Sequence, residues 1–151
     1  MFSAMIFTNE LVEKKSSKVK LAIKHLKELN ERKPYENMAL TYDIGYCAYD
    51  ILFNHLYYGI NILLRLDSDF LHKKIEQLSS DDEILTLYLN KYITNKITDD
   101  TIREKYEKEV SVQIRITKVK VTPPNGKTYT ETLLSTLPME EFSKRRFKRI
   151  I

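Results

Sequence analysis

The hydrophobic pattern of this chain changes its period at Val110, and that change constrains the fold more than any other feature. Before it, apolar residues recur every three or four positions, which is the spacing of amphipathic helices. From there the segment VSVQIRI places Val110, Val112, Ile114 and Ile116 on one side and polar residues on the other, which is strand spacing. The chain of 151 residues is long enough for one domain, so both parts are expected to share it.

The part before Val110 is expected to form an N-terminal bundle of four to five helices. They are predicted at about residues 9–32, 35–64, 67–78, 80–93 and 98–109. Pro34 ends the first helix and can open the second, where its missing N–H costs nothing. The run SDDE at residues 80–83 has the pattern of a capping box and predicts the start of the fourth helix.

The part after Val110 is expected to form a β-hairpin and a basic C-terminal helix. The motif PPNG at residues 123–126 is a turn, and KTYTETLL returns as a second strand. The alternation slips at Val119, which predicts a bulge near Thr117 or Lys118. The predicted class is α+β, mainly α. Its parts are a helical bundle at 1–109, a hairpin at 110–134 packed on it, and a helix or tail at 135–151, in one compact domain.

Positive charge is concentrated after the change of period. Residues 1–109 carry 16 basic and 18 acidic side chains, whereas residues 110–151 carry nine basic and three acidic ones. A surface of one sign attracts polyanions, and each neutralised phosphate of a nucleic acid releases counterions. The candidate contacts for nucleic acid or another partner are the cations of the hairpin and tail: Arg115, Lys118, Lys120, Lys127, Lys144, Arg145, Arg146, Lys148 and Arg149.

Motifs of cofactor and metal sites are missing from the sequence. It has no Walker loop and no GxGxxG, and its three glycines are isolated. His25, His55 and His72 are scattered, and Cys47 is the single cysteine, so no CxxC or HxxxH pair exists. We therefore expect neither a cofactor nor a metal. The most apolar stretch, residues 51–64, is too short to span a membrane and favours a buried helix.

One segment supports an enzymatic alternative. In RLDSDFLH, residues 65–72, an Arg is followed by a His after a short gap, and the Tyr-rich segment before it is loosely similar as well. This pattern resembles the motif of the HEPN superfamily, helical-bundle ribonucleases of toxin and antiviral systems. The resemblance implies that His72 acts as acid or base on an RNA 2′-hydroxyl. It also implies that Arg65 stabilises phosphate charge, usually where two protomers meet.

The interpretation that these observations favour is a non-enzymatic binding protein or regulator, located in the cytoplasm. Its expected partner is nucleic acid, or an acidic or nucleic-acid-binding protein surface, contacted by the hairpin and tail. It has no expected transmembrane segment and can form a homodimer. The composition and plan suit a protein encoded by a virus or mobile element. Two alternatives stay open: the HEPN-type metal-independent ribonuclease with Arg65 and His72, and a structural or assembly subunit.

Overall fold

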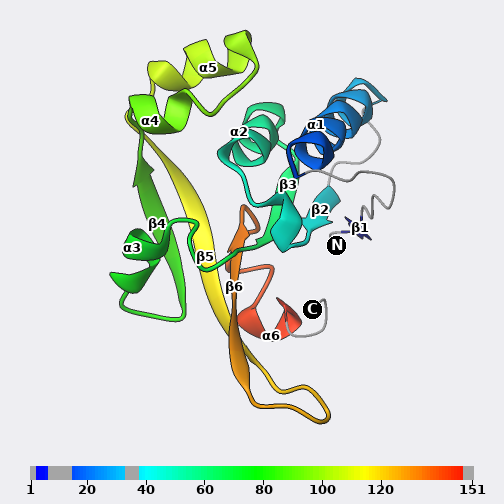
Figure 1. Cartoon of the computed structure of the whole chain (residues 1–151), viewed down its shortest axis with the longest axis vertical. Coiled ribbons are helices and arrows are strands. Elements are labelled where there is room, and N and C mark those ends of the chain that lie inside the picture. The colour runs from blue at the N-terminus through cyan, green and yellow to red at the C-terminus, as the bar shows by residue number, and fades with distance from the viewer. Residues whose placement is uncertain (1–2, 7–14, 33–37, 148–151) are drawn as a thin grey trace.

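The computed structural model describes residues 3–6, 15–32 and 38–147, and the statements below concern this part of the chain. Within it, six strands form one mixed sheet with the order β1-β2-β3-β6-β5-β4 (Figure 1). The strands are β1 (Ser3–Ile6), β2 (Met38–Tyr42), β3 (Asn61–Arg65), β4 (Asp82–Tyr88), β5 (Ser111–Val121) and β6 (Tyr129–Ser135). The helices are α1 (Lys15–Arg32), η1 (Ile44–Tyr46), α2 (Tyr49–Tyr58), α3 (His72–Glu76), α4 (Lys91–Thr94), α5 (Asp100–Glu107) and α6 (Lys144–Phe147).

The first half of the sheet consists of three parallel strands joined by helices. β1 pairs with β2 and β2 with β3, both in parallel, and α1 and α2 make the two connections. The three central residues of β3 are buried, because a parallel strand inside a sheet is covered on both faces. Gly59 ends α2 in the left-handed conformation, with φ 68°, and allows the chain to turn directly into β3.

The second half of the sheet is antiparallel. β6 pairs with β3, β5 pairs with β6 along most of its length, and β4 forms the edge beside β5. Asp99 caps α5 by accepting a hydrogen bond from the N–H of Ile102 at 3.1 Å. α4 and α5 lie at one end of the β4–β5 ladder, and the β5–β6 turn lies at the opposite end of the molecule (Figure 1).

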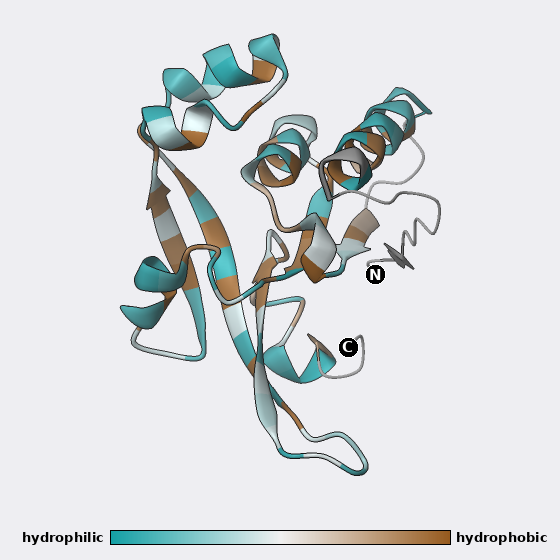
Figure 2. Cartoon of the chain, viewed as in Figure 1, coloured by the Kyte–Doolittle hydropathy of each residue, from teal (hydrophilic) through white to brown (hydrophobic). Residues whose placement is uncertain are grey.

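Apolar side chains pack against both faces of the sheet. The larger cluster joins α1, α2, α4 and α5 to one side of the strands, with Phe53, Leu64 and Ile116 among its buried members, and the loop before α3 adds Leu71. The smaller cluster covers the other side, where Phe147 of α6 packs among residues such as Leu63 and Val119. We call these sides the helical face and the α6 face. Figure 2 shows the apolar residues concentrated along the strands and on the inner sides of α1 and α2.

The expected N-terminal helical bundle is wrong. Residues 35–64 were predicted as one helix, but the described part of this segment, residues 38–64, lies in β2, η1, α2 and β3 and their connections. The spacing of three or four between apolar residues arises there because buried strands flank a short helix. Gly59 lies at the boundary between α2 and β3. The described helices other than α1, α2 and α5 have five residues or fewer, so they cannot form the core of a bundle.

The fourth predicted helix is the edge strand β4. The carboxylate of Glu83 accepts hydrogen bonds from the N–H groups of Ser79 and Ser80, at 2.9 and 3.0 Å, which is one half of a capping box, but the hydroxyl of Ser80 donates to the carbonyl of Asp82 at 3.0 Å. The chain nevertheless continues as a strand, because Leu85 and Leu87 alternate with Thr86 and bury against the core. One of the two hydrogen bonds of the predicted capping box therefore forms, but the helix that it predicts does not.

The bulge predicted near Thr117 is also wrong. The β5–β6 register runs without interruption from Arg115 to Val121. The apparent slip occurs because the buried face changes along the strand. Ile114 and Ile116 pack on the helical face, whereas Val119 packs under Phe147 on the α6 face.

Candidate functional site

The predicted binding cations do not form one surface, because the sheet separates them. Lys118 and Lys120 flank Val119 in β5, so their side chains point to the helical face. Lys144, Arg145 and Arg146 belong to α6, on the opposite side of the sheet. Lys127 is exposed in the β5–β6 turn. Lys148 and Arg149 lie outside the described residues.

Arg115 lies inside the protein, with 1% of its surface exposed. Its Nε and Nη2 atoms donate to the two carboxylate oxygens of Asp82, both at 2.7 Å. Its Nη1 atom donates to the carbonyl of Phe142 at 2.6 Å, and the guanidinium lies 5.0 Å from the ring centre of Phe147. Burial alone would raise the pKa of Asp82, but hydrogen bonds from Arg115 and Thr117 outweigh it and lower that pKa. Arg115 therefore fixes α6 to the sheet and is not accessible to a partner.

The α6 cations differ in how far protein groups hold them. Lys144 forms an ion pair with Asp81 at 3.2 Å, between two partly exposed side chains. Arg146 donates to the carbonyl of Glu141 at 2.9 Å, and Arg145 is exposed. The positive charge of this segment is therefore partly used to attach it to the protein.

Cations and hydroxyls alternate on the helical face of the hairpin. In the β5–β6 register Lys118 lies opposite Thr132, and Lys120 lies opposite Thr130. Lys120 and Thr130 are exposed, and the Nζ atom of Lys118 lies 3.5 Å from the carbonyl of Ile75 in α3. Two lysines and two threonines thus form a small polar grid on one side of a two-stranded ribbon.

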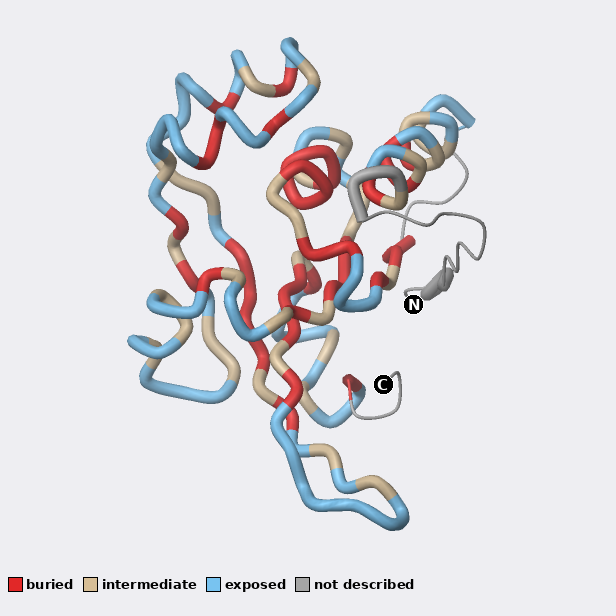
Figure 3. The backbone as a smooth tube through the Cα atoms, viewed as in Figure 1, coloured by how far each residue is buried: buried red, intermediate tan, exposed pale blue. Residues whose placement is uncertain are grey.

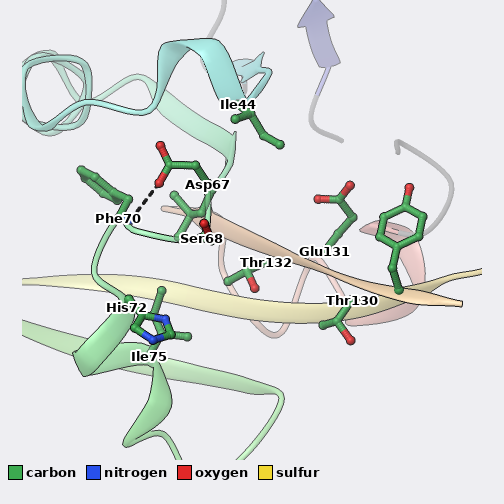
Figure 4. A pocket seen from close by; sticks show the side chains of 11 residues that line it. Ile44, Asp67, Ser68, Phe70, His72, Ile75, Thr130, Glu131 and Thr132 are labelled. Carbon is green, nitrogen blue, oxygen red and sulfur yellow. Dashed lines mark hydrogen bonds between the residues drawn. The ribbon is translucent and has the colours of Figure 1, made fainter.

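A cavity of about 580 Å³ adjoins this grid (Figure 4). Its walls are β6, η1, the loop after β3 and α3; the lining side chains include Ile44, Phe70, Ile75, Thr130, Thr132 and His72. Asp67 shapes the loop by accepting hydrogen bonds from the N–H groups of Asp69 and Phe70, at 3.1 and 2.8 Å. The cavity lies beyond the carboxyl ends of β2 and β3, the edge at which α/β sheets commonly bind ligands.

Arg65 stands at this edge, where two carboxylates hold its Nη atoms, while its buried Nε atom has no hydrogen-bond partner among the described residues. Its Nη1 atom lies 3.1 Å from Asp43, its Nη2 atom bonds to Glu131, and hydrogen bonding to Glu131 raises the pKa of Arg65. His72 begins α3, and its Nε2 atom lies 3.1 Å from the carboxylate of Glu76. The two residues of the HEPN-like segment thus occupy a strand end and a short helix, in separate ion pairs. The ribonuclease alternative gains no support from this arrangement.

His55 and two tyrosines near it are part of the core. His55 is buried and lies 2.8 Å from the hydroxyl of Tyr42, and burial lowers the pKa of His55 to about 4. Tyr42, Tyr46 and Cys47 are buried in the larger apolar cluster. Among residues 18–32 and 38–147, no three His, Cys, Asp or Glu side chains are grouped so that they could hold a metal ion.

Sequence reasoning missed two contributors to this region. Lys73 and Lys74 belong to α3, which lies on the helical face next to Lys118, and they add positive charge beside the grid. Thr130 and Thr132 were assigned only to a strand, although their opposition to lysines follows from the hairpin register. A count that starts with Pro123 opposite Gly126 would place Lys118 opposite Glu131, so the PPNG turn alone does not give this register.

Comparisons with known proteins add no assignment. No protein-family model matches the chain, and a search of curated proteins gives no significant match. In the part of the chain that the structure describes, no helix is long and apolar enough to cross a membrane.

Proposed function

We propose that this protein binds nucleic acid through the helical face of the β5–β6 hairpin. The observation that carries the proposal is the grid on one side of the ribbon, in which Lys120 and Thr130 are exposed and Lys118 and Thr132 are half-buried. Lysines supply charge to phosphates, and threonine hydroxyls donate to phosphate oxygens or to base edges. The role is that of a binding protein or regulator.

Neighbouring elements extend the positive surface. α3 adds Lys73 and Lys74 beside Lys118, and the turn adds Lys127. The acid nearest to them on β6, Glu131, is 7% exposed and is neutralised by Arg65. The hairpin therefore presents cations to a partner, while its single carboxylate is paired inside. The α6 cations face the other way and are assigned no contact with the same stretch of nucleic acid.

The test is binding of labelled nucleic acid, followed by fluorescence anisotropy at increasing salt. The logarithm of the association constant should fall linearly with the logarithm of the salt concentration. Lys120→Ala combined with Lys127→Ala should reduce the slope by about two units, because each lost phosphate contact removes about 0.9. The matched control is Lys24→Ala combined with Lys108→Ala, which removes two exposed lysines outside the hairpin. Absence of binding to every nucleic acid at low salt, or equal loss in both variants, would reject the proposal.

A further inference from the structure

The end of the β5–β6 hairpin projects from the sheet as an isolated ribbon. The β4–β5 ladder ends at Thr117, and the β3–β6 ladder ends at Leu133. The β5–β6 ladder continues for further pairs, as far as Val121 opposite Tyr129. Residues 119–131, which we call the distal hairpin, therefore lie beside no other strand of the described sheet. Figure 1 shows them extending away from the body of the molecule.

The backbone of the distal hairpin is restrained at its turn, although few of its residues are buried. Its turn is closed by a hydrogen bond of 2.7 Å between the hydroxyls of Thr122 and Thr128, and Pro123 and Pro124 restrict the backbone between them. Most of its residues are exposed or half-buried (Figure 3). An isolated two-stranded hairpin gains little stability in water. Its projection therefore points to a contact made outside this chain.

The two faces of the distal hairpin differ in chemistry. Val119 and Val121 turn toward α6 and pack near Phe147 and Phe142, so the α6 face is occupied at the root. The helical face carries Lys120 and Thr130 as exposed neighbours. In Figure 4, Thr130 and Thr132 point to the opposite side of β6 from Glu131. The α6 side is covered at the root and exposes Tyr129 further out, whereas the helical side is polar and positive.

The dimensions of the ribbon match one groove of nucleic acid. Two strands lie about 4.8 Å apart, and three register pairs extend about 10 Å. The major groove of B-form DNA is about 12 Å wide and about 8.5 Å deep, and it admits a two-stranded ribbon. Its minor groove is about 6 Å wide, and the major groove of A-form RNA is too narrow for side chains to read.

We propose that the distal hairpin enters the major groove of duplex DNA with its helical face toward the base edges. Thr130 then lies against the bases, and Lys120, Lys127 and the α3 lysines lie near the phosphates. This inference rests on the proposed function, because it names the nucleic acid and the groove that the same surface takes. In this arrangement the turn holds the two strands of the ribbon together where they enter the groove.

The experiment uses the full chain and one sequence in three forms: B-form DNA duplex, single strand and RNA duplex. Dimethyl sulfate methylation of guanine N7 reports the major groove, and of adenine N3 the minor groove. We expect tightest binding to the DNA duplex, with N7 protected and N3 reactive. Replacing residues 120–130 with Asn-Gly, which removes Lys120 and Thr130 and leaves Val119 opposite Glu131 across a two-residue turn, should abolish N7 protection. Lys24→Ala should retain it, and circular dichroism should show both variants folded.

Different outcomes separate this inference from the proposed function. Salt-dependent binding without N7 protection, or with equal preference for single strands or RNA duplex, would overturn the groove assignment and leave nucleic-acid binding standing. Unchanged N7 protection in the shortened variant would likewise overturn it, since another element would occupy the groove. Failure to bind any nucleic acid would overturn both proposals and favour a protein partner.

Discussion

Replacement of Arg115 by Ala tests how the C-terminal segment is attached to the sheet. The substitution leaves the carboxylate of Asp82, which is 21% exposed, without its bidentate partner. It also removes the donor to the carbonyl of Phe142 and the cation above Phe147. Removing one partner of a buried ion pair costs about 3–5 kcal/mol of stability. Because Asp82 is partly exposed, we expect Arg115→Ala to lower the free energy of unfolding by about 3 kcal/mol.

Thermal and urea unfolding followed by circular dichroism measure this loss directly. A domain of this size should lose about 2–4 °C in Tm per kcal/mol, hence roughly 6–12 °C. Arg115→Lys keeps the charge but loses the planar fork, so about 1–2 kcal/mol should be lost. Limited proteolysis of Arg115→Ala should show earlier cleavage within residues 137–147 than elsewhere.

The control is Arg146→Ala, an exposed arginine of the same segment, which should change stability by less than about 0.5 kcal/mol. Equal effects of the two substitutions would refute the assignment of Arg115 as the anchor of α6. A loss below about 1 kcal/mol in Arg115→Ala would refute it as well, because removal of a buried ionic partner exceeds that cost.

Three further predictions follow from individual groups. Because its pKa is lowered in the folded state, ionised Asp82 stabilises the protein at pH values above its ordinary pKa of 3.8. This stability should be lost as the pH falls through the folded-state value, so acid titrations of Asp82→Asn and the parent should converge. Asp50→Ala should cost about 1.5–3 kcal/mol, measured by urea unfolding, because the carboxylate accepts from the N–H and hydroxyl of Thr98. The ribonuclease alternative requires metal-independent RNA cleavage that disappears in His72→Ala. We expect no such cleavage, since Asp43 and Glu131 hold the guanidinium of Arg65 that would have to bind phosphate, and cleavage by purified protein would restore that alternative.

The sequence predicts elements well where one local rule dominates. The alternation after Val110 and the PPNG turn correspond to β5 and β6, and the caps near Asp99 correspond to α5. Both cases depend on contacts between residues close in sequence.

The sequence fails where burial on two faces removes the periodic signal. β2 and β3 lie in the parallel half of the sheet and are covered on both faces, so consecutive residues in them are apolar. Such a run fits a buried helix as well as a buried strand. The arrangement of this region depends on strand pairing between residues distant in sequence, such as Leu40 of β2 with Ile62 of β3. Local spacing cannot reveal such pairing, and for this reason a sheet was mistaken for a bundle.

The charge of the last 42 residues shows why composition alone cannot locate an interface. Its nine cations suggest one basic surface, but the fold gives them different tasks. Arg115 is enclosed and holds α6, Lys144 is paired with Asp81, and Lys120 is exposed on the other side of the sheet. Because alternate residues of a strand point to opposite faces, the field that a partner meets depends on register and not on the count of charges. The face that concentrates unpaired cations with hydroxyls is the helical face of the hairpin, so binding experiments should begin there and not with the tail.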